Sequence, residues 1–223
     1  MRAKPKRFYA RTPQRPAPAR PATGHTFLIV VEGAATEPAY FKEIRAKLKR
    51  KTAAVFVWHG KHTDPIGIVR EAIKLRDAQL EKAEQATTEP YDQVWVVFNR
   101  ETQNHPRSEQ VPAALRLAED NGVQVALSIP SFEFWLLLHF DYTKTAFHGC
   151  PAVKKALKKF IKDYEKADLP LSDLISRVAT AMKHAEKCHA HWDAVEGDRN
   201  PSTDVDKLLR ALNDSARAEV RLF

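Results

Sequence analysis

Hydrophobic positions along the chain fall into short unbroken runs and longer segments of helical spacing. The unbroken runs predict four buried strands, at residues 27–31, 53–58, 93–98 and 123–129. Segments in which apolar residues recur every three to four positions predict helices after each strand, at residues 36–50, 65–85, 111–120 and 132–140. Strands that alternate with helices indicate a mainly parallel sheet joined by crossover helices. We therefore expect an α/β fold with a core of about four strands.

The pattern changes after residue 140. Helical spacing returns at residues 151–164, 171–191 and 203–215, with no convincing strand among them. We therefore expect three parts in the chain. They are an extended or disordered arm at residues 1–25, an α/β core at 26–145, and a helical C-terminal region at 146–223 that packs on the core.

The positive charge is concentrated in the arm. The formal net charge is +8, yet residues 1–31 hold seven of the 36 Lys and Arg residues and no acid, which leaves 29 bases against 28 acids elsewhere. Five of the 14 prolines lie in the first 21 residues. Such a segment buries too little apolar surface to offset its ordering entropy. The arm either binds nucleic-acid phosphates, solubilises the protein or docks on a partner protein.

Several classes of protein are disfavoured by what the sequence lacks. We find no N-terminal apolar leader and no run near the roughly 18 apolar residues of a membrane span, so we expect no membrane contact. Two cysteines are too few for a secreted disulfide scaffold, which favours the cytoplasm. Neither a phosphate-binding P-loop, nor a dinucleotide-binding glycine motif, nor a serine-hydrolase elbow occurs, so ATP hydrolysis would have to come from a partner.

Polar groups that can bind metal follow the predicted strands. They are Glu32 and Glu37 after the first, Asp64 after the second, Asn99 and Glu101 after the third, and Glu133 after the fourth. Parallel strands end at one edge of a sheet, so we expect these groups to converge there. Clustered oxygen ligands suit Mg²⁺, which can clamp a phosphodiester while a glutamate moves a proton. The alternative is that each acid only stabilises the positive N-terminal end of a helix. This alternative applies least to Glu32.

Four motifs resemble the RloB family of Toprim-related proteins. The first runs from Leu28 through Glu32-Gly33 and Thr36-Glu37-Pro38 to Phe41. The others are Gln93-Val-Trp-Val-Val-Phe-Asn-Arg-Glu101, Ala126-Leu-Ser-Ile-Pro-Ser-Phe-Glu-Phe-Trp-Leu-Leu-Leu-His-Phe140 and Asn200-Pro-Ser-Thr-Asp-Val-Asp-Lys-Leu. The basic arm is also typical of this family. The resemblance spans nearly the whole chain, and its third motif is the most specific.

The resemblance implies a Toprim-like core and a nuclease that uses Mg²⁺ or Mn²⁺ to cleave DNA or RNA. It also implies a role in bacterial anti-phage defence, including abortive infection, together with an ABC-type ATPase partner. By position, Glu32 would be the acid/base and a metal ligand, and Asn99 and Glu101 would be further metal ligands. Glu133 would be a second catalytic candidate. Glu37, Ser131, His139 and Asn200 match the motifs without a settled role.

One position departs from the pattern of the family. The second motif is expected to read Phe-Asp-Arg-Asp, but here it reads Phe98-Asn99-Arg100-Glu101. Glu101 keeps a carboxylate, whereas Asn99 keeps an oxygen and loses a charge, so Mg²⁺ should bind more weakly. Three explanations stay open: natural divergence, a deliberate substitution, or a catalytically impaired nucleic-acid-binding or regulatory subunit. The oligomeric state and the choice between DNA and RNA are not encoded in any motif.

Further binding candidates lie outside these motifs. Those for nucleic acid are Arg100, His105 and the bases of the arm, Arg2, Lys4, Lys6, Arg7, Arg11, Arg15 and Arg20. The Lys-rich C-terminal helices either present a solvated face or hold the phosphate backbone. Recognition of a nucleotide or small phosphate at the strand edge is a third possibility. His184, Cys188 and His191 share a helical face, so a zinc site is a weaker alternative. Trp58, Trp95 and Trp135 are expected in the core, and Trp192 at the surface.

Overall fold

The computed structural model describes residues 25–48, 53–60, 62–85, 88–162, 164 and 169–215. Its strands are β1 (His25–Val31), β2 (Ala53–His59), β3 (Gln93–Asn99), β4 (Gln124–Ile129) and β5 (Ser202–Thr203). The first helices are α1 (Thr36–Leu48), α2 (Pro65–Glu84), the 3₁₀ helix η1 (Pro106–Gln110), α3 (Val111–Asp120) and α4 (Glu133–Leu138). The later helices are α5 (Cys150–Leu157), α6 (Leu171–Ser176), α7 (Val178–Asp193) and α8 (Val205–Asp214). Residues 1–24 of the predicted arm lie outside the described residues, and its last residue, His25, begins β1.

The strands form one sheet in the order β2-β1-β3-β4-β5. The first four strands are parallel, and β5 runs antiparallel to β4. Val31, the last residue of β1, lies opposite His59 of β2 and Val97 of β3, while Asn99 lies opposite Ser128. The expected α/β fold class is therefore confirmed, and the four parallel strands end along one edge. The relation to Toprim domains stays a prediction.

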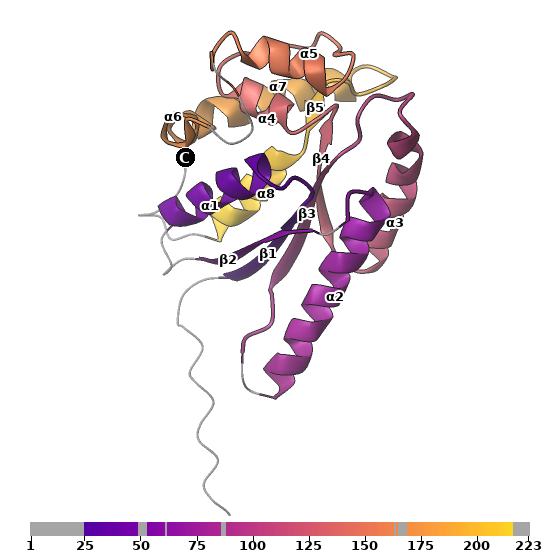
Figure 1. The fold of residues 1–223 in the computed structure, drawn as a ribbon, viewed down its shortest axis with the longest axis vertical. Helices are drawn as coiled ribbons and strands as arrows, with labels where there is room; N and C mark the ends of the chain where they lie inside the picture. Colours follow the sequence, from indigo (N-terminus) through magenta and orange to yellow (C-terminus); the bar gives the residue numbers. More distant parts are fainter. Residues whose placement is uncertain are drawn as a thin grey trace, which may run out of the picture.

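Helices cover both faces of this sheet, and this explains the unbroken apolar runs in the sequence (Figure 1). Helices α2 and α3 lie on one face, and α1 and α8 lie on the other (Figure 1). Alternate residues of β1 enter different cores: Phe27 and Ile29 pack on the α1 side, and Leu28 and Val30 on the α2 side. A strand buried on both faces needs apolar residues at every position.

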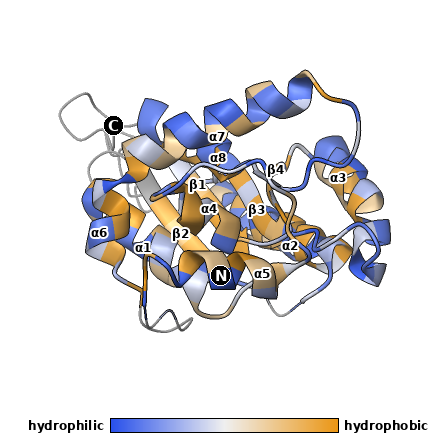
Figure 2. Ribbon diagram, turned by 90° about the horizontal axis from the view of Figure 1, so that it is seen from above, coloured by the Kyte–Doolittle hydropathy of each residue, from blue (hydrophilic) through white to orange (hydrophobic). Residues whose placement is uncertain are grey.

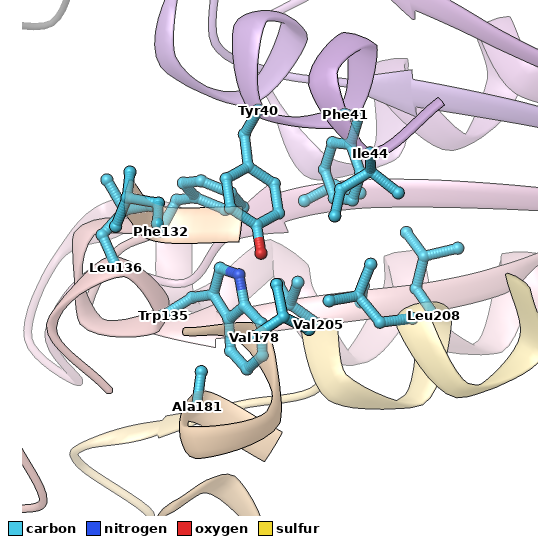
Figure 3. Packing of buried hydrophobic residues seen from close by; sticks show 14 of the residues in the cluster. Tyr40, Phe41, Ile44, Phe132, Trp135, Leu136, Val178, Ala181, Val205 and Leu208 are labelled. Atoms are coloured by element: carbon cyan, nitrogen blue, oxygen red, sulfur yellow. The ribbon is translucent and has the colours of Figure 1, made fainter. Parts of the chain in front are cut away.

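The larger core joins the first helix to the C-terminal helices. Tyr40 of α1 packs edge-on against Phe132 and Trp135 around α4, with ring centroids 5.7 and 6.4 Å apart. Side chains of α7 and α8, including Val178 and Leu208, complete the cluster (Figure 3). Figure 2 shows hydrophobic strands at the centre and helices that mix hydrophobic and hydrophilic residues around them. The C-terminal helices thus share the core of the sheet.

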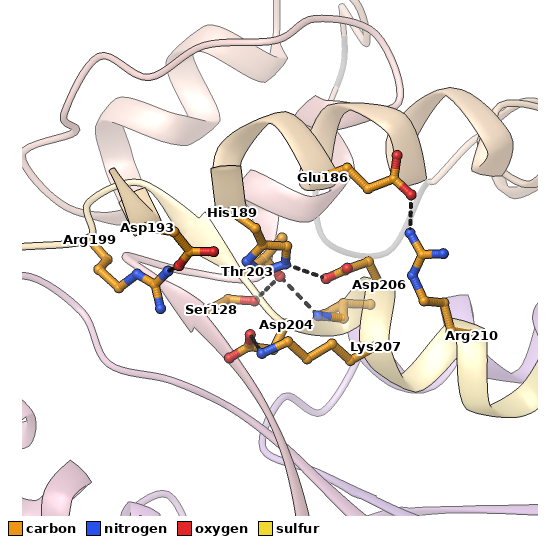
Figure 4. A network of polar contacts seen from close by, with 11 residues as sticks. Ser128, Glu186, His189, Asp193, Arg199, Thr203, Asp204, Asp206, Lys207 and Arg210 are labelled. Atoms are coloured by element: carbon orange, nitrogen blue, oxygen red, sulfur yellow. Dashed lines mark hydrogen bonds and ion pairs between the residues drawn. The ribbon is translucent and has the colours of Figure 1, made fainter. Parts of the chain in front are cut away.

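The structure corrects three expectations for the C-terminal region. A strand is present after residue 140, because β5 pairs with β4 and the hydroxyls of Ser128 and Thr203 are hydrogen-bonded at 2.9 Å (Figure 4). The helix expected at 171–191 is interrupted at Arg177, which separates α6 from α7. The helix expected at 151–164 is shorter, since α5 ends at Leu157. Tertiary contacts override the local pattern at these places.

Of the three tryptophans expected in the core, two are buried there. Trp95 and Trp135 are almost inaccessible, whereas Trp58 on the edge strand β2 is 43% exposed, so its prediction was wrong. Trp192, expected at the surface, is half-buried and donates a hydrogen bond to the carbonyl oxygen of Pro201. Cys150 and Cys188 are both free thiols. In the part of the chain that the structure describes, no helix is both long and apolar enough to cross a membrane.

Candidate functional site

The side chain of Glu32 bridges the ends of two central strands. Its backbone N–H donates to the carbonyl oxygen of Val97 at 3.0 Å, which continues the pairing of β1 with β3 beyond Val31. Its carboxylate oxygen Oε2 accepts the backbone N–H of Asn99 at 3.1 Å. The structure therefore brings Glu32 and Asn99 together at the carboxyl edge, where sequence placed them.

Arg107 neutralises this glutamate, and the sequence analysis did not identify it. Its Nη1 lies 2.7 Å from Oε1 of Glu32, and its Nε donates to the carbonyl oxygen of Asn99 at 2.9 Å. The side chains of Arg107 and Glu32 are only 14% and 15% exposed. A mostly buried carboxylate that is held by this guanidinium and by the backbone N–H of Asn99 has a fixed orientation.

The loop that carries Arg107 is shaped by His105. Nδ1 of His105 accepts the backbone N–H of Arg107 at 3.2 Å and so caps η1. His105 itself is exposed. Its predicted contact with phosphate stays a prediction, and the structure adds a local role in presenting Arg107.

The surroundings of Glu32 raise the pKa of its carboxyl group and so favour the protonated form. Burial raises the pKa of Glu32 above its ordinary value and outweighs the opposing effect of Arg107. The backbone hydrogen bond from Asn99 also lowers this pKa, and the nearby charge of Glu101 raises it. A carboxyl group with a raised pKa is better suited to exchange protons near neutral pH.

The backbone after β3 is strained at Glu101. This residue has a φ of 66°, in the left-handed region that side chains other than glycine seldom adopt. Its N–H donates to the carbonyl oxygen of Pro130 at 3.0 Å, and the N–H of Arg100 donates to Ser128 at 3.0 Å. These bonds tie the loop to the segment after β4. Unusual backbone of this kind concentrates at functional sites.

Arg100, a predicted nucleic-acid contact, already has an acidic partner. Its Nη2 lies 2.5 Å from Oδ1 of Asp198, and its side chain is 16% exposed. Asp198 comes from the segment before β5, nearly 100 residues away in sequence. The ion pair joins the loop after β3 to the C-terminal region.

Glu133 is surrounded by a different set of residues. Its Oε1 accepts the hydroxyl hydrogen of Tyr164 at 3.2 Å and lies 3.7 Å from Nζ of Lys154, and its Oε2 lies 3.4 Å from Sγ of Cys150. Burial and the charge of Glu133 raise the pKa of the Cys150 thiol, which keeps it protonated. Close by in sequence, Ser131 is 1% exposed, and its Oγ has no hydrogen-bond partner among the described residues.

The remaining motif residues lie in the interior. Glu37 is buried in the first turn of α1. His139 is fully buried, with its Nδ1 2.9 Å from the carbonyl oxygen of Trp135 and its Nε2 3.1 Å from the Tyr40 hydroxyl. Asn200 accepts from the N–H of Phe147 and donates to its carbonyl oxygen. These hydrogen bonds tie His139 and Asn200 to neighbouring parts of the chain. Asp64 caps α2 by accepting the N–H of Gly67 at 2.7 Å.

Glu32, Asn99 and Glu101, which together form the Glu32 group, offer oxygen atoms to a divalent cation. Across the described ranges, no three His, Cys, Asp or Glu side chains are grouped to hold a metal ion. The donors here are instead two carboxylates, of Glu32 and Glu101, and the Oδ1 of Asn99, which is buried without a partner among the described residues. Hard oxygen donors fit Mg²⁺ or Mn²⁺, and an unpartnered buried acceptor is an atom that such an ion would satisfy. The residues therefore fit the ion chemically, although Arg107 already supplies a positive charge.

The zinc alternative finds no support in the geometry. Nδ1 of His184 donates to the carbonyl oxygen of Leu138 at 2.8 Å, and Cys188 is 1% exposed. Burial raises the pKa of Cys188 to about 12, which opposes formation of the thiolate that binds zinc. The helical spacing of these residues therefore reflects the packing of α7.

These observations define the class of the protein: an α/β protein with a mostly buried, arginine-paired glutamate at the carboxyl edge of its sheet. Within that class, the chain belongs to the family described as RloB-like protein, because the sequence model of this family matches residues 27–212. Comparison with curated proteins and with solved structures returned no match.

Proposed function

We propose that this RloB-like protein is a nuclease that cleaves phosphodiester bonds of DNA or RNA with the help of Mg²⁺ or Mn²⁺. The observation that carries the proposal is the Glu32 carboxylate bonded to the backbone N–H of Asn99, whose own Oδ1 is buried without a hydrogen-bond partner among the described residues. Family membership supports it too. A parallel α/β sheet binds its ligands outside the carboxyl ends of its strands, where this group lies.

In this proposal each residue has a defined task. Glu32, Glu101 and Asn99 hold the ion, which polarises a phosphoryl oxygen when bound. Glu32 exchanges a proton with the attacking or leaving oxygen, and its raised pKa suits that exchange. Arg107 orients Oε1 of Glu32. Glu133 acts as a second acidic group if the bound phosphate extends towards α4.

A second candidate function is a nucleic-acid-binding or regulatory subunit with impaired catalysis. The ion pair between Arg107 and Glu32 favours it, because the arginine occupies an oxygen that the acid/base needs free. Asn99 in place of an acid favours it too, since the ion loses one full negative charge. The two functions differ in whether the ion displaces Arg107.

The partners belong to the proposal as well. We propose that the basic arm contacts nucleic acid, that an ABC-type ATPase acts with the protein in anti-phage defence, and that both work in the cytoplasm. The support is the clustering of seven bases in the arm, the family membership, and the lack of a P-loop in the chain.

Cation titration of four proteins separates the two functions. The wild type, Asn99→Asp, Arg107→Gln and Glu32→Gln are titrated with Mg²⁺ and Mn²⁺ by calorimetry and assayed on single- and double-stranded DNA and RNA. We expect Asn99→Asp to bind Mg²⁺ about tenfold more tightly and to cleave faster, because it restores a charged ligand. Glu32→Gln should lose both binding and cleavage.

The variant Arg107→Gln tests whether the ion displaces the arginine, as the nuclease requires. If Mg²⁺ competes with Arg107 for Glu32, Mg²⁺ binding should tighten in this variant. Unchanged Mg²⁺ binding would favour the binding subunit. Equal inactivity of wild type and Asn99→Asp on every substrate, with no saturable ion binding in either, would rule out the nuclease and leave the binding subunit.

A further inference from the structure

A surface hollow on α7 combines unneutralised positive charge with an aromatic ring. The hollow has a volume of about 460 Å³ and is lined by Thr180, Lys183, His184, Glu186, Lys187 and Ala190. A volume of this size falls in the range of small-ligand sites, roughly 300–1,000 Å³. The hollow lies outside the Glu32 group and belongs to none of the four sequence motifs.

The acids of α7 are paired with arginines, whereas its lysines have no carboxylate partner in the part of the chain that the structure describes. Glu186 is paired with Arg210 of α8, and Asp193 with Arg199 (Figure 4). Lys183 and Lys187 are exposed, and neither has a carboxylate partner within the described ranges. The hollow therefore carries an excess of positive charge even though one acid helps to line it.

Aromatic and imidazole rings border the same surface. Nζ of Lys187 lies 5.7 Å from the ring centroid of Tyr142, and the ring of His184 lies 6.1 Å from it. His184 is held in place by the hydrogen bond from its Nδ1 to the carbonyl oxygen of Leu138. Cations beside a half-buried aromatic ring are the elements with which proteins hold single-stranded nucleic acid, as phosphate contacts and a stacking platform.

The hollow lies beside the C-terminal end of α4. Nδ1 of His184 donates to the carbonyl oxygen of Leu138, the last residue of α4, and Glu133 is the first residue of that helix. All six residues of α4 are buried, so the helix itself offers no surface to a strand, and the α7 hollow is a contact surface separate from the Glu32 group.

We propose that the α7 hollow binds one strand of a nucleic acid, with Lys183 and Lys187 on its phosphates and a base against Tyr142. The inference rests on the proposed function, because it gives the nucleic-acid substrate a second contact surface. Phosphate contacts of this kind position a strand without reading its sequence. The single strand is favoured over a duplex because a stacking platform needs an unpaired base face.

The test is fluorescence anisotropy of a labelled 20-nucleotide single strand with the full-length protein, in EDTA so that no cleavage occurs. Lys183→Glu/Lys187→Glu should weaken binding at least tenfold and flatten the salt dependence of log K by about 1.4, at roughly 0.7 per lost phosphate contact. Tyr142→Ala should weaken binding about fivefold or more with an unchanged salt slope, and Tyr142→Phe should bind like the wild type.

The matched control is Lys74→Glu/Lys82→Glu, which makes the same change in net charge on exposed residues of α2, across the sheet. Equal weakening in this control, or wild-type affinity and salt slope in the α7 variant, overturns the proposal. Polyglutamate of equal charge is the second control. If it binds with the same affinity as the single strand and is equally weakened by Lys183→Glu/Lys187→Glu, the proposal is overturned in favour of an acidic protein partner.

Failure of this inference is distinguishable from failure of the proposed nuclease. The nuclease is read from Mg²⁺ binding and from cleavage of bis(p-nitrophenyl) phosphate, a substrate too small to reach from the carboxyl edge to α7. Both should be unchanged in Lys183→Glu/Lys187→Glu. A wild type that binds Mg²⁺ but no single strand overturns only the α7 hollow.

Discussion

Glu32 and Arg107 show how one mostly buried ion pair sets the chemistry of this edge of the sheet. Removing a carboxylate from water is costly, and the arginine offsets that cost through a direct ion pair. The pKa of Glu32 is nevertheless raised, because burial is the larger effect. The glutamate is therefore held in one orientation while its protonated form stays accessible, as an acid/base requires.

The buried ring of His139 gives the protein a pH-dependent stability. Burial, with a smaller contribution from the nearby charge of Arg177, lowers the pKa of His139 from an ordinary value of 6.5 to about 4. Between these values the unfolded chain binds the proton and the folded chain does not, so stability falls as pH falls from about 6.5 to about 4. We expect a loss of at most about 3 kcal/mol across this window, measured by urea unfolding.

A non-titrating replacement isolates this effect. His139→Gln keeps a donor for the carbonyl oxygen of Trp135 and an acceptor for Tyr40, so its stability should depend less on pH whatever its absolute value. His59→Gln, at an exposed position of β2, should retain the wild-type slope. An unchanged slope in His139→Gln would show that other groups cause the acid sensitivity.

Sequence reasoning found one half of the Glu32 site and missed the other half. Glu32 and Asn99 could be placed because they directly follow buried strands, and parallel strands end together. Arg107 could not, since a pairing across 75 residues depends on the path of the loop that follows β3. The signal available was its position in that loop, eight residues after Asn99. Glu133 was placed on the same edge, but its partners Tyr164, Lys154 and Cys150 come from a region that the strand pattern does not cover.

At the scale of elements, the turn from β1 to α1 depends on a glycine. A Cβ on Gly33 would lie 1.9 Å from Oε2 and 2.5 Å from Cδ of Glu37, which is buried. Gly33→Ala should therefore destabilise the protein by roughly 1–3 kcal/mol through overpacking. In a Glu37→Ala background the same substitution should cost at least about 1 kcal/mol less, because the clashing carboxylate is gone. Urea unfolding of the four proteins completes this double-mutant cycle.

Gly60→Ala is the matched control for this cycle. Gly60 follows β2 as Gly33 follows β1, but its added Cβ would lie 3.1 Å from the nearest atom, a carboxylate oxygen of Glu71. Its cost should be small and independent of Glu37. Equal costs of Gly33→Ala with and without the Glu37 side chain would mean that the backbone of the turn, and not this contact, requires glycine.

Elements with strong periodicity were predictable, and elements defined by tertiary contacts were not. The strands β1 and β3 are apolar at successive positions because both faces are covered, and this pattern is visible in the sequence. β5 has only two residues, Ser202 and Thr203, and exists because they pair with β4. Its polar sequence carries no strand signal. The break at Arg177 likewise follows from how α6 and α7 pack, since no glycine or proline marks it.

At the scale of the whole molecule, the C-terminal helices and the sheet share one hydrophobic cluster. Ile29 of β1 and Leu209 of α8 are both fully buried in it, although 180 residues separate them. The ion pair of Arg100 with Asp198 and the pairing of β5 with β4 add polar links between the same regions. Regions joined through a common core unfold together.

We therefore expect a single unfolding transition for the described body of the protein. Ile29→Ala and Leu209→Ala should each destabilise it by about 2–5 kcal/mol, the usual cost of emptying such a position in a core. In both variants the midpoint should shift equally whether it is followed by circular dichroism or by tryptophan fluorescence, because Trp95 and Trp135 report from the sheet and from α4 of one cooperative unit. Leu80→Ala, at an exposed position of α2, should leave the midpoint nearly unchanged. Two separate transitions, with Leu209→Ala shifting only one of them, would instead make the C-terminal helices an independent domain whose contacts with the sheet contribute little to its stability.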